Sequence, residues 1–529
     1  MKEMLYCFQL LICSLAIFSC DKPITPDDDS NAPVLPEPAP ELIYASKPLN
    51  QCETIASDWM HSYTYSSSNF SVQTFGADKK EGRFCYAIKY AFEGRGTSEY
   101  VFFRHGWDTW RTDLSFEPWG ISFWIKGTPT NAGKLRFSLI ADSQMTPGTQ
   151  ISREVYEYVC DDWHKNAEWQ LAFIPYSKLT PVPGTNVELQ LDKVIAYRID
   201  FVNTENVSQA NNYVYIDDIR QQTTFDAEAE MNRNAKFNSI FIQLAPDYAG
   251  KDASSWEESF RDLQSVGINE IIVQYAITDR GEAWYSDTRV SWASVREPII
   301  DNIMAGAERC GFNVVLGMYG GGYGETNEAL IPKNREVADD LIRRFGSSPA
   351  FSGWYIAQEF YDSTWERNWL KNSKERDALA DYNETVAAYC KSKKDVPVMI
   401  APALWRGMPA KMTGEWFDAI FARTPHVDIL YLQDCGGRGG LEVTCPTVDL
   451  PNWYKYIKEA CDKHGVEFGV DLESFESLPS GGSISRDWDY LQYQLYIAGM
   501  FTDYITNFSW ITFRPGDKNF ETYRKTLTN

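Results

Sequence analysis

The chain has 529 residues, of which 44% are hydrophobic, 23% charged and 15% aromatic, and its formal net charge is −23. This length and composition predict a soluble globular protein of two domains. So acidic a chain is a poor partner for nucleic acid or an anionic membrane surface, since both need basic patches. With only five histidines, and Cys160/His164 and Cys461/His464 as isolated pairs, zinc and Ser-His-Asp chemistry are disfavoured and carboxylates are the expected catalytic groups.

Residues 1–19 have the pattern of an export signal. Lys2 gives a basic start, and Leu5 to Phe18 is an apolar run of signal-peptide length, too short to span a bilayer. The run ends in Ala16-Ile17-Phe18-Ser19-Cys20, which resembles a bacterial lipobox and implies lipidation at Cys20. A plain secretory signal with an accidental cysteine is the alternative. We therefore expect an exported outer-membrane lipoprotein that meets the membrane only through its lipid.

Residues 20–48 are expected to form an extended tether. The run Asp27-Asp28-Asp29 and the four prolines from Pro33 to Pro40 cannot bury apolar surface. The acidic stretch after Cys20 resembles the surface-export signal of Bacteroidetes lipoproteins, which implies that the folded part faces outward from the cell. No later stretch is long and apolar enough to cross a bilayer.

Residues 49–222 show short alternating runs separated by turn residues, which predict an antiparallel β-sandwich. The expected strands are Phe84–Tyr90, Tyr100–Phe103, Trp119–Gly127, Leu135–Ile140, Trp169–Phe173, Ile195–Phe201 and Tyr213–Ile219. The phrases ISFWIKG and YVYIDDIR resemble galactose-binding-type jelly rolls that accompany polysaccharide-degrading enzymes. The resemblance implies either a sugar-binding module or a brace for a neighbouring domain. It also implies a structural calcium ion near the last strand, held by Asp217 or Asp218, whereas the residues themselves indicate no other cofactor or metal.

The cysteines leave two states open. Cys52 with Cys85, and Cys435 with Cys445, are candidates to pair in an oxidising compartment. Free buried thiols are the equal alternative, and the sequence does not decide between them.

After a polar linker at 223–235, the segment 236–529 alternates apolar runs with amphipathic helical stretches. The runs centre on Ile240, Ile271, Val314, Trp354, Val398, Leu430, Phe468 and Ile505. Helices are expected at Trp256–Val266, Pro298–Arg309, Arg335–Phe345, Arg376–Lys391, Glu415–Arg423, Trp453–Lys463 and Asp487–Met500. Eight such units predict a (β/α)8 barrel. A doubly wound sheet is disfavoured because the first run ends in Gln243-Leu244-Ala245-Pro246 and not in a Gly-rich phosphate turn.

Two glutamates stand at the ends of predicted strands four and seven. By alternation, Glu359 lies on the same face as Gly353, Tyr355 and Ala357, and Glu473 lies on the same face as Gly469 and Asp471. Active sites in such barrels lie at the carboxyl ends of the strands, so both glutamates point to the mouth. The reserve candidates for the second carboxylate are Asp434, Asp471 and Glu476.

This arrangement resembles the large glycosidase clan that places its acid/base after strand four and its nucleophile after strand seven. The resemblance implies retaining hydrolysis with Glu359 as acid/base and Glu473 as nucleophile, since glycoside cleavage needs one carboxyl to protonate the leaving oxygen and one to attack. The clan usually has Asn before the acid, where this chain has Gln358.

Other strand ends offer amides and aromatic rings for a sugar. The expected substrate-binding residues are Gln243, Tyr275, Tyr319, Gln358, Trp405, Arg406, Gln433 and Trp510. Each of these residues, taken singly, is equally compatible with a structural role. The Gly-rich stretches at 320–324 and 436–440 are interpreted as subsite walls, because neither leads into a GKS or GKT motif.

The lipobox, the jelly-roll phrases and GWYIAQEF together resemble a group of Bacteroidetes surface lipoproteins proposed to be glycoside hydrolases of unassigned activity. The resemblance covers nearly the whole mature chain and implies a carbohydrate substrate. The competing hypothesis is a non-catalytic surface glycan-binding lipoprotein with a degenerate barrel, because fold alone does not settle function. A polysaccharide lyase or deacetylase would need a Lys, Tyr, Arg or metal-ligand cluster that the sequence does not show.

Overall fold

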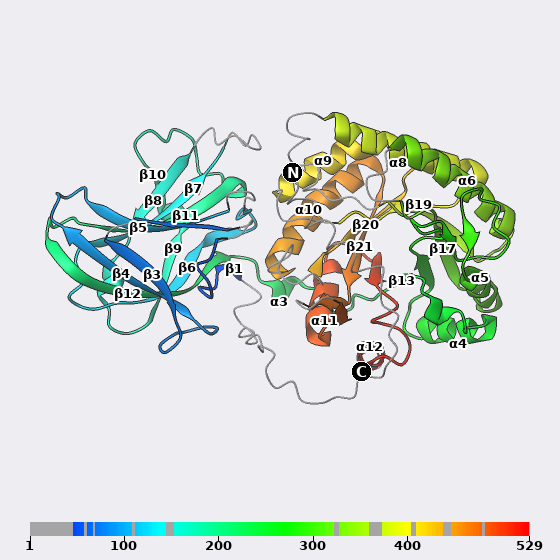
Figure 1. Ribbon diagram of the computed structural model, residues 1–529, viewed down its shortest axis with the longest axis horizontal. Helices are drawn as coiled ribbons and strands as arrows, with labels where there is room; N and C mark the ends of the chain where they lie inside the picture. The colour runs from blue at the N-terminus through cyan, green and yellow to red at the C-terminus, as the bar shows by residue number, and fades with distance from the viewer. Residues whose placement is uncertain are drawn as a thin grey trace.

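The computed structural model describes residues 46–57, 61–66, 69–107, 112–143, 153–321, 327–358, 373–403, 409–436, 446–478 and 482–527. Within these ranges an antiparallel β-sandwich is followed by a closed parallel barrel, and the two lie side by side (Figure 1). The predicted fold class is confirmed. The predicted signal, Cys20 and the tether as far as residue 45 lie outside the described residues.

Two six-stranded sheets form the sandwich. The β12 sheet has the order β3-β4-β12-β6-β9, with β1 paired to β12, and the β11 sheet has the order β10-β8-β7-β11-β5-β2. The strands of the β12 sheet are β1 (Ser46–Asn50), β3 (Phe70–Phe75), β4 (Cys85–Glu93), β6 (Pro118–Lys126), β9 (Gln170–Pro175) and β12 (Ser208–Thr223). Those of the β11 sheet are β2 (Ser62–Tyr65), β5 (Tyr100–Gly106), β7 (Lys134–Ala141), β8 (Glu154–Val159), β10 (Thr180–Pro181) and β11 (Val194–Val202).

Alternating apolar residues of the two sheets make the sandwich core. Phe123 from the β12 sheet stacks on Phe137 from the β11 sheet with ring centroids 6.2 Å apart, and both are fully buried. Three short 3-10 helices, η1 (Asp162–Lys165), η2 (Tyr176–Lys178) and η3 (Leu191–Lys193), lie between strands. Cys52 and Cys85 are buried free thiols and do not form a disulfide with each other. Cys445, the expected partner of Cys435, lies outside the described residues.

The segment between the domains packs on the barrel. Helix α3 (Ala227–Glu230) begins at Asp226, whose carboxylate accepts from the backbone N–H of Ala229 at 3.1 Å. Ala227 and Ala235 belong to the barrel core, with 1% and 9% of their surfaces exposed. Part of the predicted linker is therefore part of the barrel.

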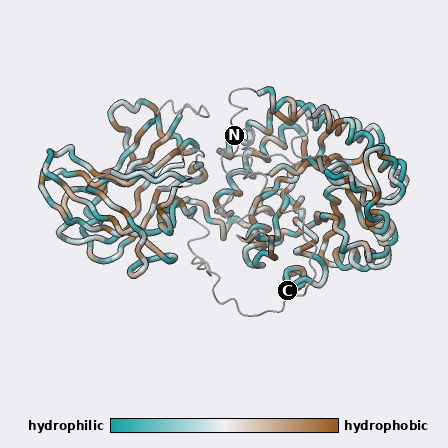
Figure 2. The backbone as a smooth tube through the Cα atoms, viewed as in Figure 1, coloured by the Kyte–Doolittle hydropathy of each residue, from teal (hydrophilic) through white to brown (hydrophobic). Residues whose placement is uncertain are grey.

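The barrel closes in the order β13-β14-β17-β18-β19-β20-β21-β24, and every neighbouring pair is parallel. Its strands are β13 (Ser239–Ile242), β14 (Glu270–Val273), β17 (Asn313–Gly317), β18 (Phe351–Ile356), β19 (Val398–Ile400), β20 (Ile429–Gln433), β21 (Glu467–Glu473) and β24 (Ile505–Phe508). Each predicted strand centre falls inside one of them. Hydrophobic segments are found in the interior of the barrel, and hydrophilic segments are found along the outer helices (Figure 2).

Helices lie around the barrel at all seven predicted places, and a further helix near residue 520 was not predicted. They are α4 (Ala253–Gln264), α5 (Ile299–Cys310), α6 (Asn327–Phe345), α8 (Lys374–Lys393), α9 (Ala410–Phe421), α10 (Pro446–His464), α11 (Trp488–Ala498) and α12 (Lys518–Thr526). Smaller elements are η4 (Pro246–Tyr248), the pair β15 (Glu282–Ala283) and β16 (Ser294–Val295), and the hairpin of β22 (Phe475–Ser477) and β23 (Ser483–Ser485). Within the described residues, no helix has the length and apolar character needed to cross a membrane.

Polar contacts tie the sandwich to the barrel. Asp113, before β6, accepts from the backbone N–H of Ala410 at 2.8 Å and from the side-chain amide of Asn452 at 3.1 Å. Lys47 of β1 pairs with Asp449 of α10 at 2.6 Å, and both side chains are mostly buried. The sandwich therefore docks on the side of the barrel formed by α9 and α10.

Candidate active site

The carboxyl ends of the parallel strands gather the predicted residues at one end of the barrel. Glu473 is the last residue of β21, Gln433 is the last residue of β20, and Gln243 follows β13 by one position. Because all eight strands run the same way, these side chains share the mouth. Glu473 is 3% exposed.

A buried carboxylate holds the main chain at Glu473. Asp434, directly after β20, accepts through Oδ1 from the backbone N–H of Glu473 at 3.1 Å and of Gly436 at 3.0 Å. Its Oδ2 accepts from the side-chain amide of Gln494 on α11. Burial raises the pKa of Asp434 to about 6, and these hydrogen bonds partly offset that rise. The ends of strands six and seven are thus joined through one side chain.

Ser474 fixes the main chain on the other side of Glu473. Its backbone N–H donates to the carbonyl of Phe508 at 2.7 Å, and its hydroxyl lies 2.9 Å from Asn507 Oδ1 and 2.8 Å from Thr512 Oγ1. The backbone at Glu473 is therefore held by strand six on one side and strand eight on the other. Such support keeps a catalytic side chain within the narrow geometry that chemistry requires.

Arg486 adds a positive charge beside this network. Its guanidinium donates to the carbonyl of Gly436, lies 4.0 Å from the ring centroid of Tyr490, and its positive charge lowers the pKa of Asp434. Asn519 donates to the Arg486 carbonyl at 2.7 Å, so α12 also braces this loop.

In strand four, Tyr355 and Ala357 point into the barrel, as alternation predicts. Tyr355 and Ala357 belong to the cluster of residues inside the barrel, together with Phe241 and Met399. Gln358 follows as a half-buried residue, and Glu359 lies outside the described residues. Gly321, in the Gly-rich stretch after strand three, has a φ of +72°, and a Cβ there would meet Gln358 Oε1 at 2.2 Å. This glycine allows the loop to lie against the Gln358 amide.

Three of the predicted sugar contacts have partners within the protein. Gln433 donates its amide to the carbonyl of Ala401 at 2.8 Å. Tyr319 is 1% exposed, and its hydroxyl accepts from Lys333 at 3.1 Å. Trp510 is 2% exposed and packs on Trp256 with ring centroids 5.2 Å apart.

The expected stacking platform at Trp510 is therefore corrected, because the ring is part of the core. Gln243 and Tyr275 are half-buried. Trp405, Arg406 and the Gly-rich residues 437–440 lie outside the described residues. Of the reserve carboxylates, Asp471 lies one inward position deeper than Glu473, and Glu476 is half-buried in the β22–β23 hairpin.

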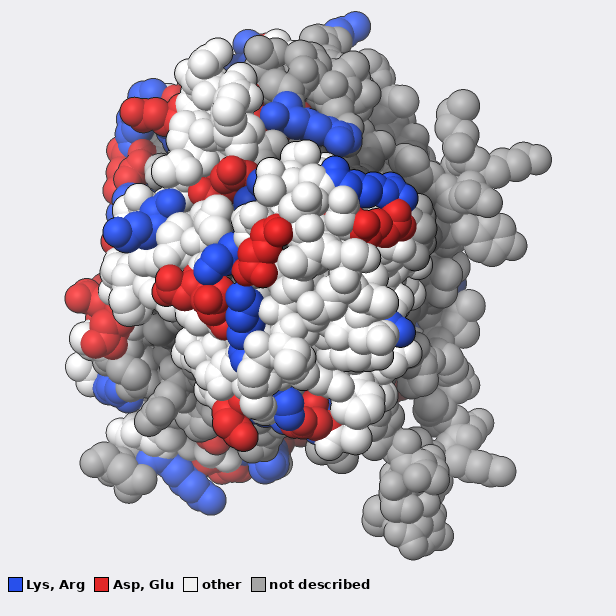
Figure 3. All heavy atoms as spheres, turned by 90° about the vertical axis from the view of Figure 1, so that its left-hand side faces the viewer, with Lys and Arg blue, Asp and Glu red and all other residues white. Residues whose placement is uncertain are grey.

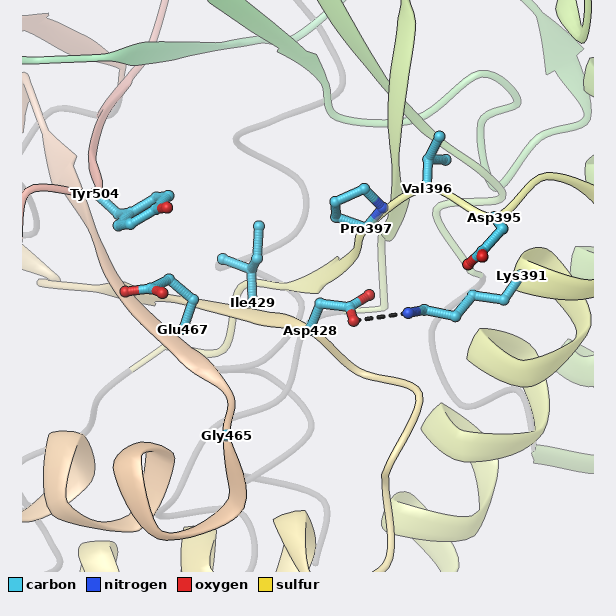
Figure 4. Close-up of a pocket in the computed structure, with 9 residues that line it drawn as sticks. All are labelled: Lys391, Asp395, Val396, Pro397, Asp428, Ile429, Gly465, Glu467 and Tyr504. Carbon is cyan, nitrogen blue, oxygen red and sulfur yellow. Dashed lines mark hydrogen bonds and ion pairs between the residues drawn. The ribbon is translucent and has the colours of Figure 1, made fainter.

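A cavity of about 310 Å³ opens at the opposite end of the barrel, where strands β19, β20, β21 and β24 begin (Figure 4). Its lining residues are Lys391, Asp395, Val396, Pro397, Asp428, Ile429, Gly465, Glu467 and Tyr504. Asp428 points to Lys391, 2.7 Å away, and also accepts from the backbone N–H of Val398 at 2.7 Å (Figure 4). Glu467 lies on the side of Tyr504, so the carboxylates do not converge on one point.

The sequence analysis missed several residues of the site, among them Ser474, Gln494 and Arg486. Gln494 lies on the buried side of α11 with Leu491 and Leu495, and is itself fully buried. A polar residue on an apolar helix stripe is the signal that would have revealed it. Arg486 stands in a loop between polar neighbours, and no pattern distinguishes it.

The calcium ion implied for the sandwich does not fit the residues present. Asp217 accepts through Oδ2 from the backbone N–H groups of Lys80 at 2.8 Å and Glu81 at 2.9 Å, and Asp218 pairs with Arg220 at 2.6 Å. Hydrogen-bond donors and a guanidinium thus occupy Oδ2 of both carboxylates. Oδ1 of each is buried without a hydrogen-bond partner in the described part of the chain, but two oxygens fall short of the roughly six to eight that calcium takes. Among the described residues, no group of three or more His, Cys, Asp and Glu is placed to hold a metal ion.

Comparison with known proteins gives a family but no activity. No curated protein matches the sequence. A Bacteroides thetaiotaomicron protein of proposed α-L-fucosidase activity is similar with a TM-score of 0.48 and 17% identity, over 56% of this chain and 97% of that one.

Two Clostridium thermocellum structures are also similar. The first is a family 11 carbohydrate-binding module in complex with a β-1,3-1,4-mixed-linked tetrasaccharide, with a TM-score of 0.26 and 17% identity over 34% of this chain and 98% of that one. The second holds the CBM22-1 and GH10 modules of the endo-1,4-β-D-xylanase 10B with xylohexaose, with a TM-score of 0.31 and 9% identity over 88% and 90%. A family profile matches residues 239–519, more than half of the chain, and the protein therefore belongs to DUF4434, a family described as a domain of unknown function.

Proposed function

We propose that the barrel is a glycoside hydrolase in which Glu473 is the nucleophile and Glu359 the general acid/base. The observation that carries this proposal is the place of Glu473, at the carboxyl end of strand seven with its backbone held by Asp434 and Ser474. Strand four ends at the same mouth, and the sequence continues from Gln358 into Glu359.

The histidines support carboxylate chemistry. All five fall within the described residues, and none stands at the carboxyl end of a barrel strand. His105 and His164 are buried in the sandwich, whereas His426 and His464 pair with Glu384 and Asp418 at 2.6 Å. A histidine base for a serine or cysteine nucleophile is therefore not offered at the mouth.

In the proposed reaction the Glu473 carboxylate attacks the anomeric carbon and forms a glycosyl ester. The Glu359 carboxylic acid gives its proton to the leaving oxygen as the glycosidic bond breaks. Glu359, now ionised, then takes a proton from water, the water oxygen attacks the anomeric carbon, and the Glu473 carboxylate leaves. The configuration at the anomeric carbon is retained, because it is inverted twice.

The test is hydrolysis by matched variants of the full mature chain. A polysaccharide panel and aryl glycosides first identify a substrate. Glu473→Ala should abolish turnover of every substrate, while Glu359→Ala should still open activated aryl glycosides and should be rescued by azide with retained configuration. General acid–base help is worth about 10²–10⁴-fold, so the loss on natural glycosides should be large.

Glu467→Gln is the matched control, because Glu467 begins the strand that Glu473 ends. It should hydrolyse the substrate at the wild-type rate. If both site variants also cleave at that rate, the site assignment fails. If the wild type binds glycans of the panel and hydrolyses none, the barrel is a binding scaffold and the hydrolase proposal is wrong.

We also propose that the protein is an outer-membrane lipoprotein, anchored at Cys20 and facing outward from the cell. The support is the apolar run that ends in the lipobox-like sequence, followed by the acidic and proline-rich segment. A carbohydrate polymer outside the cell would then be within reach of the barrel mouth.

A further inference from the structure

The β11 sheet turns a polar face away from the sandwich core. Phe137, Ile199 and Phe103 point inward and are almost completely buried. Their neighbours in sequence therefore point outward, because side chains alternate along a strand. The outward residues used below are Tyr100, Phe102, Arg104, Arg136, Ser138, Glu157, Arg198 and Asp200, and we call this surface the Asp200 face.

A buried carboxylate organises the centre of the Asp200 face. Asp200 is fully buried although it lies on the outer side of the sheet. Its Oδ2 accepts from Arg136 Nε at 2.8 Å and from Arg198 Nη2 at 3.0 Å. Arg136 also pairs with Glu157 at 3.2 Å. A buried charge is stable only when it is paired in this way, so the two guanidiniums are held in fixed positions.

The four charged groups balance, since two arginines face two carboxylates. Arg136 and Arg198 remain 19% and 20% exposed, and Glu157 26%. The face therefore offers guanidinium N–H donors beside a carboxylate acceptor without a large net charge. Figure 3 views the end of the sandwich and shows basic and acidic side chains placed next to one another there.

Aromatic rings lie beside these polar groups. Tyr100 is 45% exposed, and its ring centroid is 5.7 Å from the guanidinium carbons of both Arg136 and Arg198. Phe102 lies 6.2 Å from the Tyr100 ring and 5.8 Å from Arg198. An exposed ring next to fixed donors and an acceptor presents an apolar surface and hydrogen-bonding groups together.

One hydroxyl on this face has no partner. Ser138 lies in register between Glu157 and Arg198, and it is fully buried. Among the described residues, its Oγ makes no hydrogen bond. A buried unpaired hydroxyl is costly, and this one lies on the outer side of the sheet, where a ligand hydroxyl can reach it once the side chains that cover it move aside.

We infer that the Asp200 face binds a neutral glycan chain. A vicinal diol needs an acceptor for its protons and a donor for its lone pairs, and Glu157 and the guanidiniums supply both. The apolar side of a pyranose suits the Tyr100 ring. A neutral sugar is favoured over an acidic one because Asp200 and Glu157 already neutralise the two central arginines, although Arg104, in register with Arg198, adds one positive charge.

The experiment measures binding of the full mature chain to soluble β-glucan, xylan, mannan and galactan by affinity electrophoresis and calorimetry. The wild type should bind at least one of them, with an affinity that changes little between low and high salt. Tyr100→Ala should weaken that binding by about tenfold. Ser138→Ala should weaken it by about three- to tenfold without lowering the melting temperature, because the hydroxyl that is removed is buried and unpaired.

Tyr213→Ala is the matched control, because Tyr213 is 40% exposed on the outer side of the β12 sheet. It should bind as the wild type does. Hydrolysis of short aryl glycosides should be equal in wild type and Tyr100→Ala, so loss of binding at this face and failure of the barrel chemistry are distinguishable.

The inference is overturned if no polysaccharide of the panel binds, or if Tyr100→Ala and Ser138→Ala bind as tightly as the wild type. Binding only to uronate-containing chains, with an affinity that falls steeply in salt, contradicts the assignment of a neutral glycan.

Discussion

Replacing Glu270 by glutamine should stabilise the barrel at neutral pH. Glu270 is the first residue of β14, and its side chain points into the barrel because Ile272, two positions later, belongs to the interior cluster. Ser352 Oγ donates to Glu270 Oε2 at 3.2 Å. Burial raises the pKa of Glu270 from its usual 4.5 to about 7, and the bond from Ser352 offsets only part of that rise.

The sign of the effect follows from where the proton binds more tightly. Between pH 4.5 and 7 the folded state keeps the Glu270 proton that the unfolded state has released, so stability falls as pH rises through this window. The shift corresponds to an upper limit of about 3 kcal/mol, reached above pH 7. Glutamine resembles the protonated acid, can still accept from Ser352, and carries no charge to bury. The variant should therefore match the wild type near pH 4.5 and exceed it at pH 8.

The assay is the melting temperature of both proteins from pH 4.5 to 8. For a barrel of this size, a gain of about 3 kcal/mol corresponds to roughly 6–10 °C at pH 8. Glu258→Gln on α4 is the control, because its side chain is exposed and it should leave the pH profile unchanged. A Glu270→Gln profile parallel to that of the wild type over the whole range would refute the reasoning.

Three further outcomes are expected. Cys20→Ala should move the protein from the membrane fraction to a soluble pool, and unchanged fractionation without lipid label on the wild type would contradict the lipid anchor. Asp434→Asn should lower kcat about tenfold with an intact fold, because the backbone N–H of Glu473 loses a charged acceptor; an unchanged kcat would remove Asp434 from the site. A fragment 224–529 should melt cooperatively, and its melting temperature should be higher than that of a fragment 232–529, which lacks α3. Equal melting temperatures would show that α3 does not contribute to barrel stability.

The barrel could be predicted because its strands are long apolar runs separated by amphipathic helices of regular length. The errors include one helix start near a proline and several sandwich strands that were not predicted, among them β3, β8 and the very short β10. A helix is expected to begin at Trp453, but α10 begins at Pro446 and contains Pro451. A proline usually marks a helix boundary, so the sequence pattern does not show that the helix continues through it. Strand β10 has two residues and forms through its pairing with β8, which no local pattern records.

Most of what could be predicted about the site followed from the parallel barrel. Once the strands were placed, alternation put Asp471 and Glu473 on one face, and chain order put Asp434 beside them. Alternation does not show how deeply a side chain is buried, which is why Trp510 was expected at the mouth. Contacts between distant segments were also beyond reach, as Gln494 meets Asp434 across 60 residues of sequence.

The contacts between the domains bear on how the two proposed sites act together. Asp113 accepts from the first turn of α9 and from Asn452 of α10, and Lys47 joins its strand to Asp449 of the same helix. Charged groups at a helix start and a mostly buried ion pair fix orientation as well as position. Strand β1 of the β12 sheet meets α10 through Lys47, while the residues of the Asp200 face belong to the other sheet. A glycan held on the Asp200 face would therefore keep a set direction relative to the barrel mouth, so binding there would favour those stretches of a polymer that the mouth can reach.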